Sequence, residues 1–236
     1  MKSWKELEAR FVERLNLKQR PVAVTLLDAE PAGITKFVGT EPSGCSFWRL
    51  AAEGRTFYTV ASDHFNCPVG SFTHKIDLPP ARQQELNDVL GFMFHVEYLK
   101  PEEISKIPQL PKAPTAVVYA PLADAPLDPS VVLFACRPAS AMLLQEAAAR
   151  ANATSALPVL GRPTCMAIPA ALSMGTTTSL GCVGNRTYTG VSDEEMYVAV
   201  PGGKLAEVDA ALDTIAAANA ALSDYARSRR AALSTV

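Results

Sequence analysis

Short runs of mostly apolar, β-branched or aromatic residues alternate with helical patterns, and this alternation limits the fold more than any other feature. Five such runs have the length and composition of buried strands, and they span residues 21–27, 56–60, 115–119, 131–135 and 196–200. A sixth, weaker strand is expected over residues 157–160, where Pro158 opposes it. Helices are expected between them, over residues 2–17, 45–53, 80–90, 138–150 and from 205 onward. The pattern predicts an α/β or α+β fold, a sheet with helical cover.

A proline-rich segment, residues 101–114, divides the chain. On each side of it a cysteine is followed by a short helical pattern, a glycine, a threonine-containing strand and a second cysteine. Cys45 and Cys67 are the pair before the segment, and Cys165 and Cys182 are the pair after it. This weak repeat predicts two similar sheet-plus-helix halves, residues 1–100 and 115–236, packed as one compact unit.

Composition and motifs exclude several classes of protein. The 236 residues are 48% hydrophobic and 19% charged with a net charge of −2, which leaves no basic surface for nucleic acid. No apolar run approaches the ~20 residues of a membrane span. The charged N-terminal residues lack a secretory signal, so we expect a cytoplasmic protein with reduced thiols. Motifs for nucleotide binding, serine hydrolysis and zinc proteolysis are absent from the sequence.

The five cysteines are the one unusual feature of the composition. An odd number in a reducing compartment leaves core packing, metal binding or thiol chemistry as their uses. If the two halves pack about a pseudo-twofold axis, Cys45, Cys67, Cys165 and Cys182 would meet, and four thiolates suit a four-iron cluster or tetrahedral zinc. The sequence has no C-x-x-C pair, and isolated cysteines often serve only as core residues. Cys136 lies outside the repeat and is predicted to pack in the core.

Charged and titratable residues near the cysteines supply further candidates. His64 lies three residues before Cys67 and could be a ligand or a proton shuttle, whereas His74 fits an ordinary surface histidine. Between residues 151 and 192 the charged residues are Arg162 and Arg186 alone, which indicates buried core, the lining of a site, or both. A buried Arg186 would need an anionic partner, such as a cluster, a phosphate or a carboxylate like that of Asp63.

Several of these blocks together resemble a known family. They are Arg20-Pro21-Val22-Ala23-Val24, Cys45 with Leu50-Ala51-Ala52-Glu53-Gly54, Asp63-His64-Phe65-Asn66-Cys67-Pro68-Val69-Gly70, Cys165, and Gly181-Cys182-Val183-Gly184-Asn185-Arg186. Over about residues 20–200 the chain is similar to the uncharacterised bacterial and archaeal family called domain of unknown function 169, or ArCR. The resemblance implies no reaction and no catalytic roles. It implies that four cysteines, and not Cys136, fall within the recurring motifs.

We therefore expect a cytoplasmic protein that binds metal through Cys45, Cys67, Cys165 and Cys182. A [4Fe–4S] cluster is the first expectation and zinc the second, with a role in redox chemistry, electron transfer or cluster carriage. One alternative is a metal-free thiol enzyme that uses Cys45 or Cys182 as nucleophile, with His64 or Arg186 stabilising charge. Another is a small-molecule-binding module with structural cysteines. The expected partners are an unknown redox partner or a small molecule, and the long final helix could form a homodimer. Whether the protein is an enzyme stays open.

Overall fold

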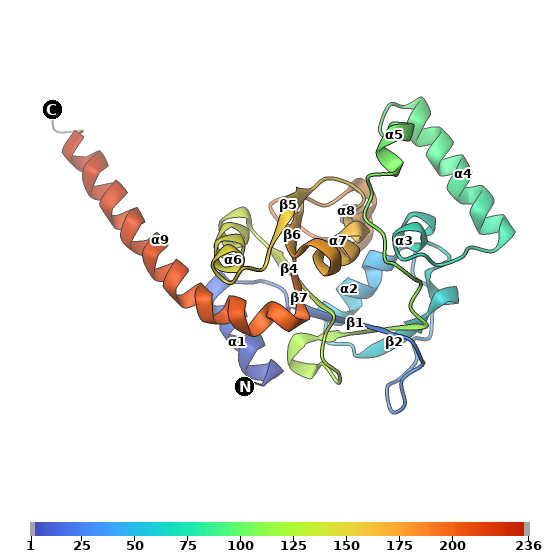
Figure 1. Cartoon of the computed structure of the whole chain (residues 1–236), viewed down its shortest axis with the longest axis horizontal. Helices are drawn as coiled ribbons and strands as arrows, with labels where there is room; N and C mark the ends of the chain where they lie inside the picture. Colours follow the sequence, from blue (N-terminus) through green and yellow to red (C-terminus); the bar gives the residue numbers. More distant parts are fainter. Residues whose placement is uncertain (1–2, 234–236) are drawn as a thin grey trace.

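A seven-stranded sheet forms the centre of the molecule in the computed structural model, which describes residues 3–233 apart from the side chains of 156–159. The strand order is β2-β3-β1-β4-β7-β6-β5 (Figure 1). Neighbouring strands run antiparallel, except that β5 and β6 are parallel. The strands are β1 Val22–Leu27, β2 Phe57–Val60, β3 Ala116–Pro121, β4 Val131–Cys136, β5 Thr154–Leu160, β6 Thr176–Ser179 and β7 Met196–Pro201.

Helices cover both faces of this sheet (Figure 1). One face packs against α1 Trp4–Leu15, α6 Pro138–Arg150 and the first turns of α9 Leu205–Leu233. The other packs against α2 Gly44–Ala52 and α7 Ala167–Met174, with α3 Pro68–Thr73 and α8 Val183–Thr189 beside them. The first helix begins where its sequence provides a capping box, with the Ser3 hydroxyl accepting from the Glu6 backbone and the Glu6 carboxylate accepting from the Ser3 backbone.

Alternating side chains divide the interior into two hydrophobic cores, because successive residues of a strand face opposite sides of a sheet. On β4, Leu133 belongs to the core under α2 and α7, whereas Phe134 and Cys136 belong to the core under α1 and α6. On β7, Ala199 and Val198 divide in the same way. A residue's parity along its strand therefore decides which of the two cores it enters.

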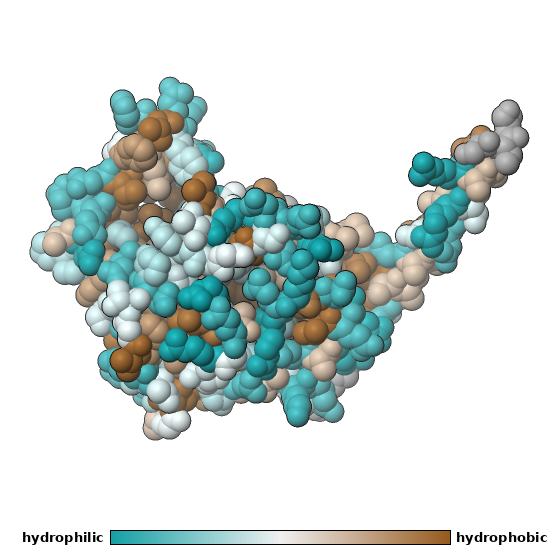
Figure 2. Space-filling model, turned by 180° about the vertical axis from the view of Figure 1, so that it is seen from behind, coloured by the Kyte–Doolittle hydropathy of each residue, from teal (hydrophilic) through white to brown (hydrophobic). Residues whose placement is uncertain are grey.

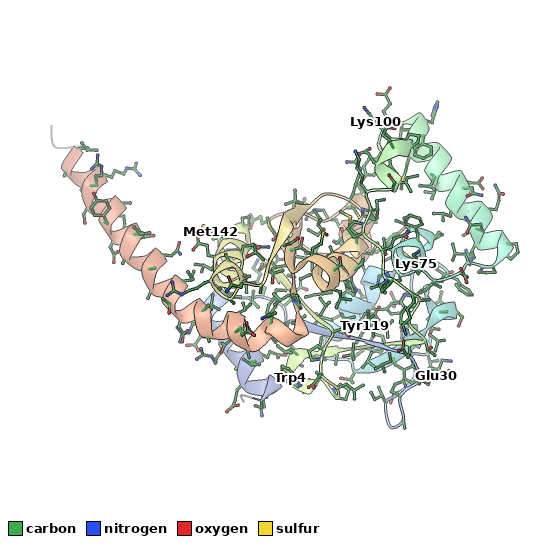
Figure 3. All side chains as sticks on the ribbon, viewed as in Figure 1. Trp4, Glu30, Lys75, Lys100, Tyr119 and Met142 are labelled. Atoms are coloured by element: carbon green, nitrogen blue, oxygen red, sulfur yellow. The ribbon has the colours of Figure 1, made fainter. Side chains whose placement is uncertain are left out.

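Two helical segments extend away from the sheet (Figure 1). Helices α4 Pro80–His95 and α5 Pro101–Ile104 form an arm, named here the α4–α5 arm. Lys100 lies at its outer end and Tyr119 on the sheet (Figure 3). At the other end of the molecule, the second half of α9 extends from the body, with Leu222 and Tyr225 exposed.

The structure confirms the predicted mixed α/β class and a strand in each of the six expected positions. The expected start of the first helix at residue 2 lies outside the described residues. Helix α4 is longer than expected and continues to His95, and the proline-rich segment contains α5. None of the helices within residues 3–233 combines the length and apolar character that a membrane crossing requires.

The internal repeat is not confirmed by the strand order. Strand β3, from the second predicted half, lies between β2 and β1 from the first, and it pairs with both. Residues on both sides of 101–114 thus build one continuous sheet. The boundaries at 100 and 115 stay a prediction.

Candidate functional site

Four cysteines from four separate segments line one cavity of about 610 Å³, on the α2–α7 side of the sheet. Cys45 is the second residue of α2, and Cys67 immediately precedes α3. Cys165 lies in a 3₁₀ turn before α7, and Cys182 immediately precedes α8. These are the four cysteines that the sequence predicts to come together. All four are free thiols.

The thiol of Cys67 packs directly against the backbone of Gly70, where a side chain would leave no space for it. Backbone N–H groups of Gly44 and Gly70 hydrogen-bond to this sulfur and favour its thiolate form. A Cβ atom on Gly70 would lie 2.8 Å from the Cys67 Sγ, closer than real Cβ atoms approach. The glycine at position 70 therefore gives the sulfur both its space and a hydrogen-bond donor.

The two cysteines of the second pair are fixed by contacts with neighbouring segments. The Cys165 thiol lies 3.9 Å from the Val69 carbonyl oxygen, and it also interacts with the hydroxyl of Thr73. The backbone N–H of Cys182 donates to the Thr164 hydroxyl at 2.6 Å. The turn that carries Cys165 thus also positions Cys182.

Burial is the main electrostatic influence on these thiols. It raises the pKa of Cys45 well above the ordinary value, and negative charge on Cys165, Cys67 and Cys182 would raise it further. Burial also raises the pKa of Cys165 and of Cys67. The four sulfurs are close enough that a negative charge on one would raise the pKa of another. Without a cation among them, Cys45, Cys67 and Cys165 are protonated at neutral pH.

Asn185, which sequence reasoning did not single out, lies beside the Cys45 thiol. Its side chain favours the ionised forms of Cys45 and of Tyr197. The residue is only 1% exposed, yet neither amide atom makes a full hydrogen bond within the described residues. A buried, unpaired amide is uncommon, because no hydrogen bond within the protein offsets the cost of removing it from water. The available signal was its place in the Gly181–Arg186 block.

His64 ends the 3₁₀ turn before Cys67, and His74 immediately follows α3; the two rings lie next to each other and do not line the cavity. The His64 Nε2 and the Thr59 hydroxyl share a hydrogen bond of 2.8 Å, and burial lowers the pKa of His64 to about 3. The two imidazole rings stack with centroids 6.4 Å apart. The prediction of a surface position for His74 is wrong, because the side chain is 5% exposed and its Nε2 has no partner within the described residues.

Arg186 serves the loop around α8. Its guanidinium donates to the backbone carbonyls of Ser192, Leu180 and Glu195 at 2.6–3.0 Å. Its ionic contact is with the exposed Asp193, at 3.6 Å. The suggested pairing with Asp63 is wrong, because that carboxylate instead accepts from the Val60 backbone N–H and closes a local turn.

Cys136 occupies the opposite face of the sheet. It is the last residue of β4, is 2% exposed and belongs to the core under α1 and α6. Burial raises its pKa to about 12. These observations agree with the prediction that Cys136 packs in the core. Because the sheet stands between it and the other cysteines, it cannot join them.

The described part of the chain contains no three His, Cys, Asp or Glu side chains that form a ready site for a single metal ion. The four cysteines line one cavity but do not form such a group among the described residues.

Comparison with known proteins identifies the family but not an activity. A family model described as uncharacterised ArCR, domain of unknown function 169, matches residues 10–210. No curated protein and no solved structure matches the chain significantly. The matched region contains every strand of the sheet and all four cysteines of the cavity. The chain therefore belongs to the uncharacterised ArCR family, domain of unknown function 169.

Proposed function

We propose that the protein binds an iron–sulfur cluster of the [4Fe–4S] type through Cys45, Cys67, Cys165 and Cys182, and that its role is in redox chemistry, electron transfer or cluster carriage. The observation that carries the proposal is the convergence of four free thiols, from four segments spread over 138 positions of the chain, on one cavity. The fifth cysteine, on the far face of the sheet, supplies an internal control.

The surroundings of the thiols suit a bound cation better than free thiolates. Ligand cysteines bind as thiolates, so a metal centre must displace their protons. Burial opposes that loss for Cys45, Cys67 and Cys165, and positive charge from iron would offset it. The backbone N–H groups of Gly44 and Gly70 would then donate to a ligand sulfur, as in other cluster sites.

The arrangement favours a cluster over zinc. In a tetrahedral zinc site each sulfur lies about 2.3 Å from the same ion. That requires the close grouping that the described residues lack. A four-iron cluster binds each thiolate at a different iron atom, so its ligand sulfurs stand further apart.

The same groups disfavour a metal-free thiol enzyme that uses Cys45. A nucleophilic cysteine needs a lowered pKa, whereas burial raises that of Cys45. The expected helper residues are also unsuitable, because the His64 ring does not line the cavity and Arg186 donates to backbone carbonyls. With all four cysteines as ligands, no iron is left open for substrate, which is why electron transfer fits better than Lewis-acid catalysis.

The test is metal analysis of a set of cysteine variants. The full chain and the five single Cys→Ser variants are purified without oxygen, and iron, acid-labile sulfide and zinc are measured per chain. We expect about four irons and four sulfides in the wild type and in Cys136→Ser, and a clear loss in each of the other four variants. Folded protein without metal, or equal iron in all five variants, would refute the proposal.

A further inference from the structure

The cavity continues beyond the cysteines, under the α4–α5 arm. Apolar side chains line it at intervals of about one helical turn: Leu86, Val89, Leu90 and Met93 of α4, and Val96 immediately after its end. Of the sixteen residues of α4 only Leu86 is buried by the protein itself. A helix normally buries such a stripe against another element. Here the stripe faces a hollow instead, and apolar side chains are visible along the arm (Figure 2).

The wall across from the arm is also apolar and exposed. On α8, Val183 is 67% exposed and Tyr188 is 45% exposed, and both line the cavity. On the arm itself Phe92 is 63% exposed. Large apolar side chains that surround a hollow of this kind mark a binding surface. The whole cavity, including the part that the cysteines line, has a volume of about 610 Å³, within the ~300–1,000 Å³ of small-molecule sites.

Polar contacts hold the arm in place and leave the hollow open. At the base of α4, the Arg82 guanidinium donates to the Asn66 amide oxygen at 2.9 Å. At the other end, the Arg162 guanidinium donates to the Tyr98 carbonyl and lies 4.4 Å from the centre of the Tyr98 ring. The cavity is therefore preformed, and a ligand can bind without a rearrangement of the arm.

The lining contains two charged side chains, Glu85 and Arg162, and both are exposed to solvent. Arg162 is engaged by Tyr98, as described above. The Glu85 carboxylate accepts two hydrogen bonds from Arg82, at 2.7 and 2.8 Å. The other lining side chains are uncharged, so a charged ligand held among them would lose its hydration without a buried counter-charge, which is costly. The lining therefore selects an uncharged occupant.

We infer that the space between the α4–α5 arm and α8 binds an uncharged, predominantly apolar small molecule, next to the four cysteines. The site goes beyond the proposed cluster and does not depend on it. A second copy of the chain would compete for the same surface, and the experiment below separates the two occupants.

The test uses the uncharged dye Nile red and the full chain, at a protein concentration where the oligomeric state has been measured. We expect a fluorescence increase that saturates at one dye per chain, in protein prepared with or without iron. 1-Octanol should displace the dye at concentrations at least about tenfold lower than octanoate, because only the latter carries a charge. Saturation in the iron-free protein keeps this inference separate from the cluster proposal.

Variants locate the dye. Val89→Glu puts a charge on the cavity-facing stripe and should weaken Nile red binding by about tenfold or more. Asn87→Glu adds the same charge to the exposed face of the same helix and should leave binding unchanged. Phe92→Ser, at an exposed position, should weaken binding less than Val89→Glu while leaving the fold intact. Equal binding in all three variants, tighter binding of octanoate, or a cavity closed by self-association of the chain would overturn the inference.

Discussion

Replacement of Gly70 by alanine would test whether the Cys67 thiol occupies a site shaped for it. The added Cβ would lie 2.8 Å from the Cys67 Sγ, and ordinary van der Waals contact begins at 3.4 Å. The two atoms must therefore separate by about 0.6 Å. Because Gly70 is inside α3 and also donates its backbone N–H to the sulfur, the shift would disturb the hydrogen bond as well.

The expected size follows from two opposing effects. Overpacking of this kind costs about 1–3 kcal/mol, whereas alanine gains roughly 0.5–1 kcal/mol over glycine within a helix. The net loss in the free energy of unfolding of Gly70→Ala should be about 0–2.5 kcal/mol. Gly91→Ala is the matched control, because it lies within α4 and its Cβ would meet nothing within 4 Å. The free energy of unfolding of Gly91→Ala should rise by about 0.5–1 kcal/mol, the difference between alanine and glycine within a helix.

Urea unfolding of the metal-free proteins, followed by tryptophan fluorescence, gives the stability difference. Iron per chain after anaerobic purification gives the effect on the site. Gly70→Ala should lose iron and Gly91→Ala should keep it. If Gly70→Ala matches Gly91→Ala in both stability and iron content, the thiol of Cys67 is not held as we argue.

Three further predictions concern groups on either side of the sheet. Asn185→Leu removes the amide that favours the ionised form of the Cys45 thiol and should therefore lower iron per chain, whereas an iron content equal to that of the wild type would contradict this. His64 has a folded pKa of about 3, below its unfolded value of about 6.5, so the unfolded chain binds the proton and stability falls as pH drops through that range. His64→Gln should remove about 1.4 kcal/mol per pH unit of this slope in urea titrations between pH 6 and 4, and an unchanged slope would refute the assignment. Cys136→Ala should lower the free energy of unfolding by roughly 1 kcal/mol through lost packing and leave iron per chain unchanged. A loss of iron would contradict the assignment of Cys136 to the core alone.

The sequence allowed the strands and the grouping of the cysteines to be predicted for different reasons. A run such as Val131–Cys136 is apolar throughout, so its composition alone predicts a buried strand, whichever strands pair with it. The order of the strands depends on long-range pairing, and the position of β3 between β2 and β1 has no local signal. The predicted pseudo-twofold grouped the four cysteines that line one cavity, although the strand order does not confirm the repeat.

Local contacts explain what sequence reasoning missed at the site. His74 was predicted to be an ordinary surface histidine, yet Thr73 and the Gly70 carbonyl hydrogen-bond to its Nδ1 inside the protein. Arg186 satisfies its charge with carbonyl groups of a loop whose path cannot be inferred from residue spacing. The apolar cavity depends on the position of the α4–α5 arm, which follows from side-chain contacts such as that of Arg162 with Tyr98.

The most direct test of the cluster proposal is the intact mass of the anaerobically purified chain, measured under native and then under denaturing conditions. The account predicts that the native mass exceeds the denatured mass by four iron and four sulfur atoms. It also predicts that the excess is retained in Cys136→Ser and lost or reduced in Cys45→Ser. A native mass equal to that of the bare chain, or an excess of one zinc ion, would contradict the proposal.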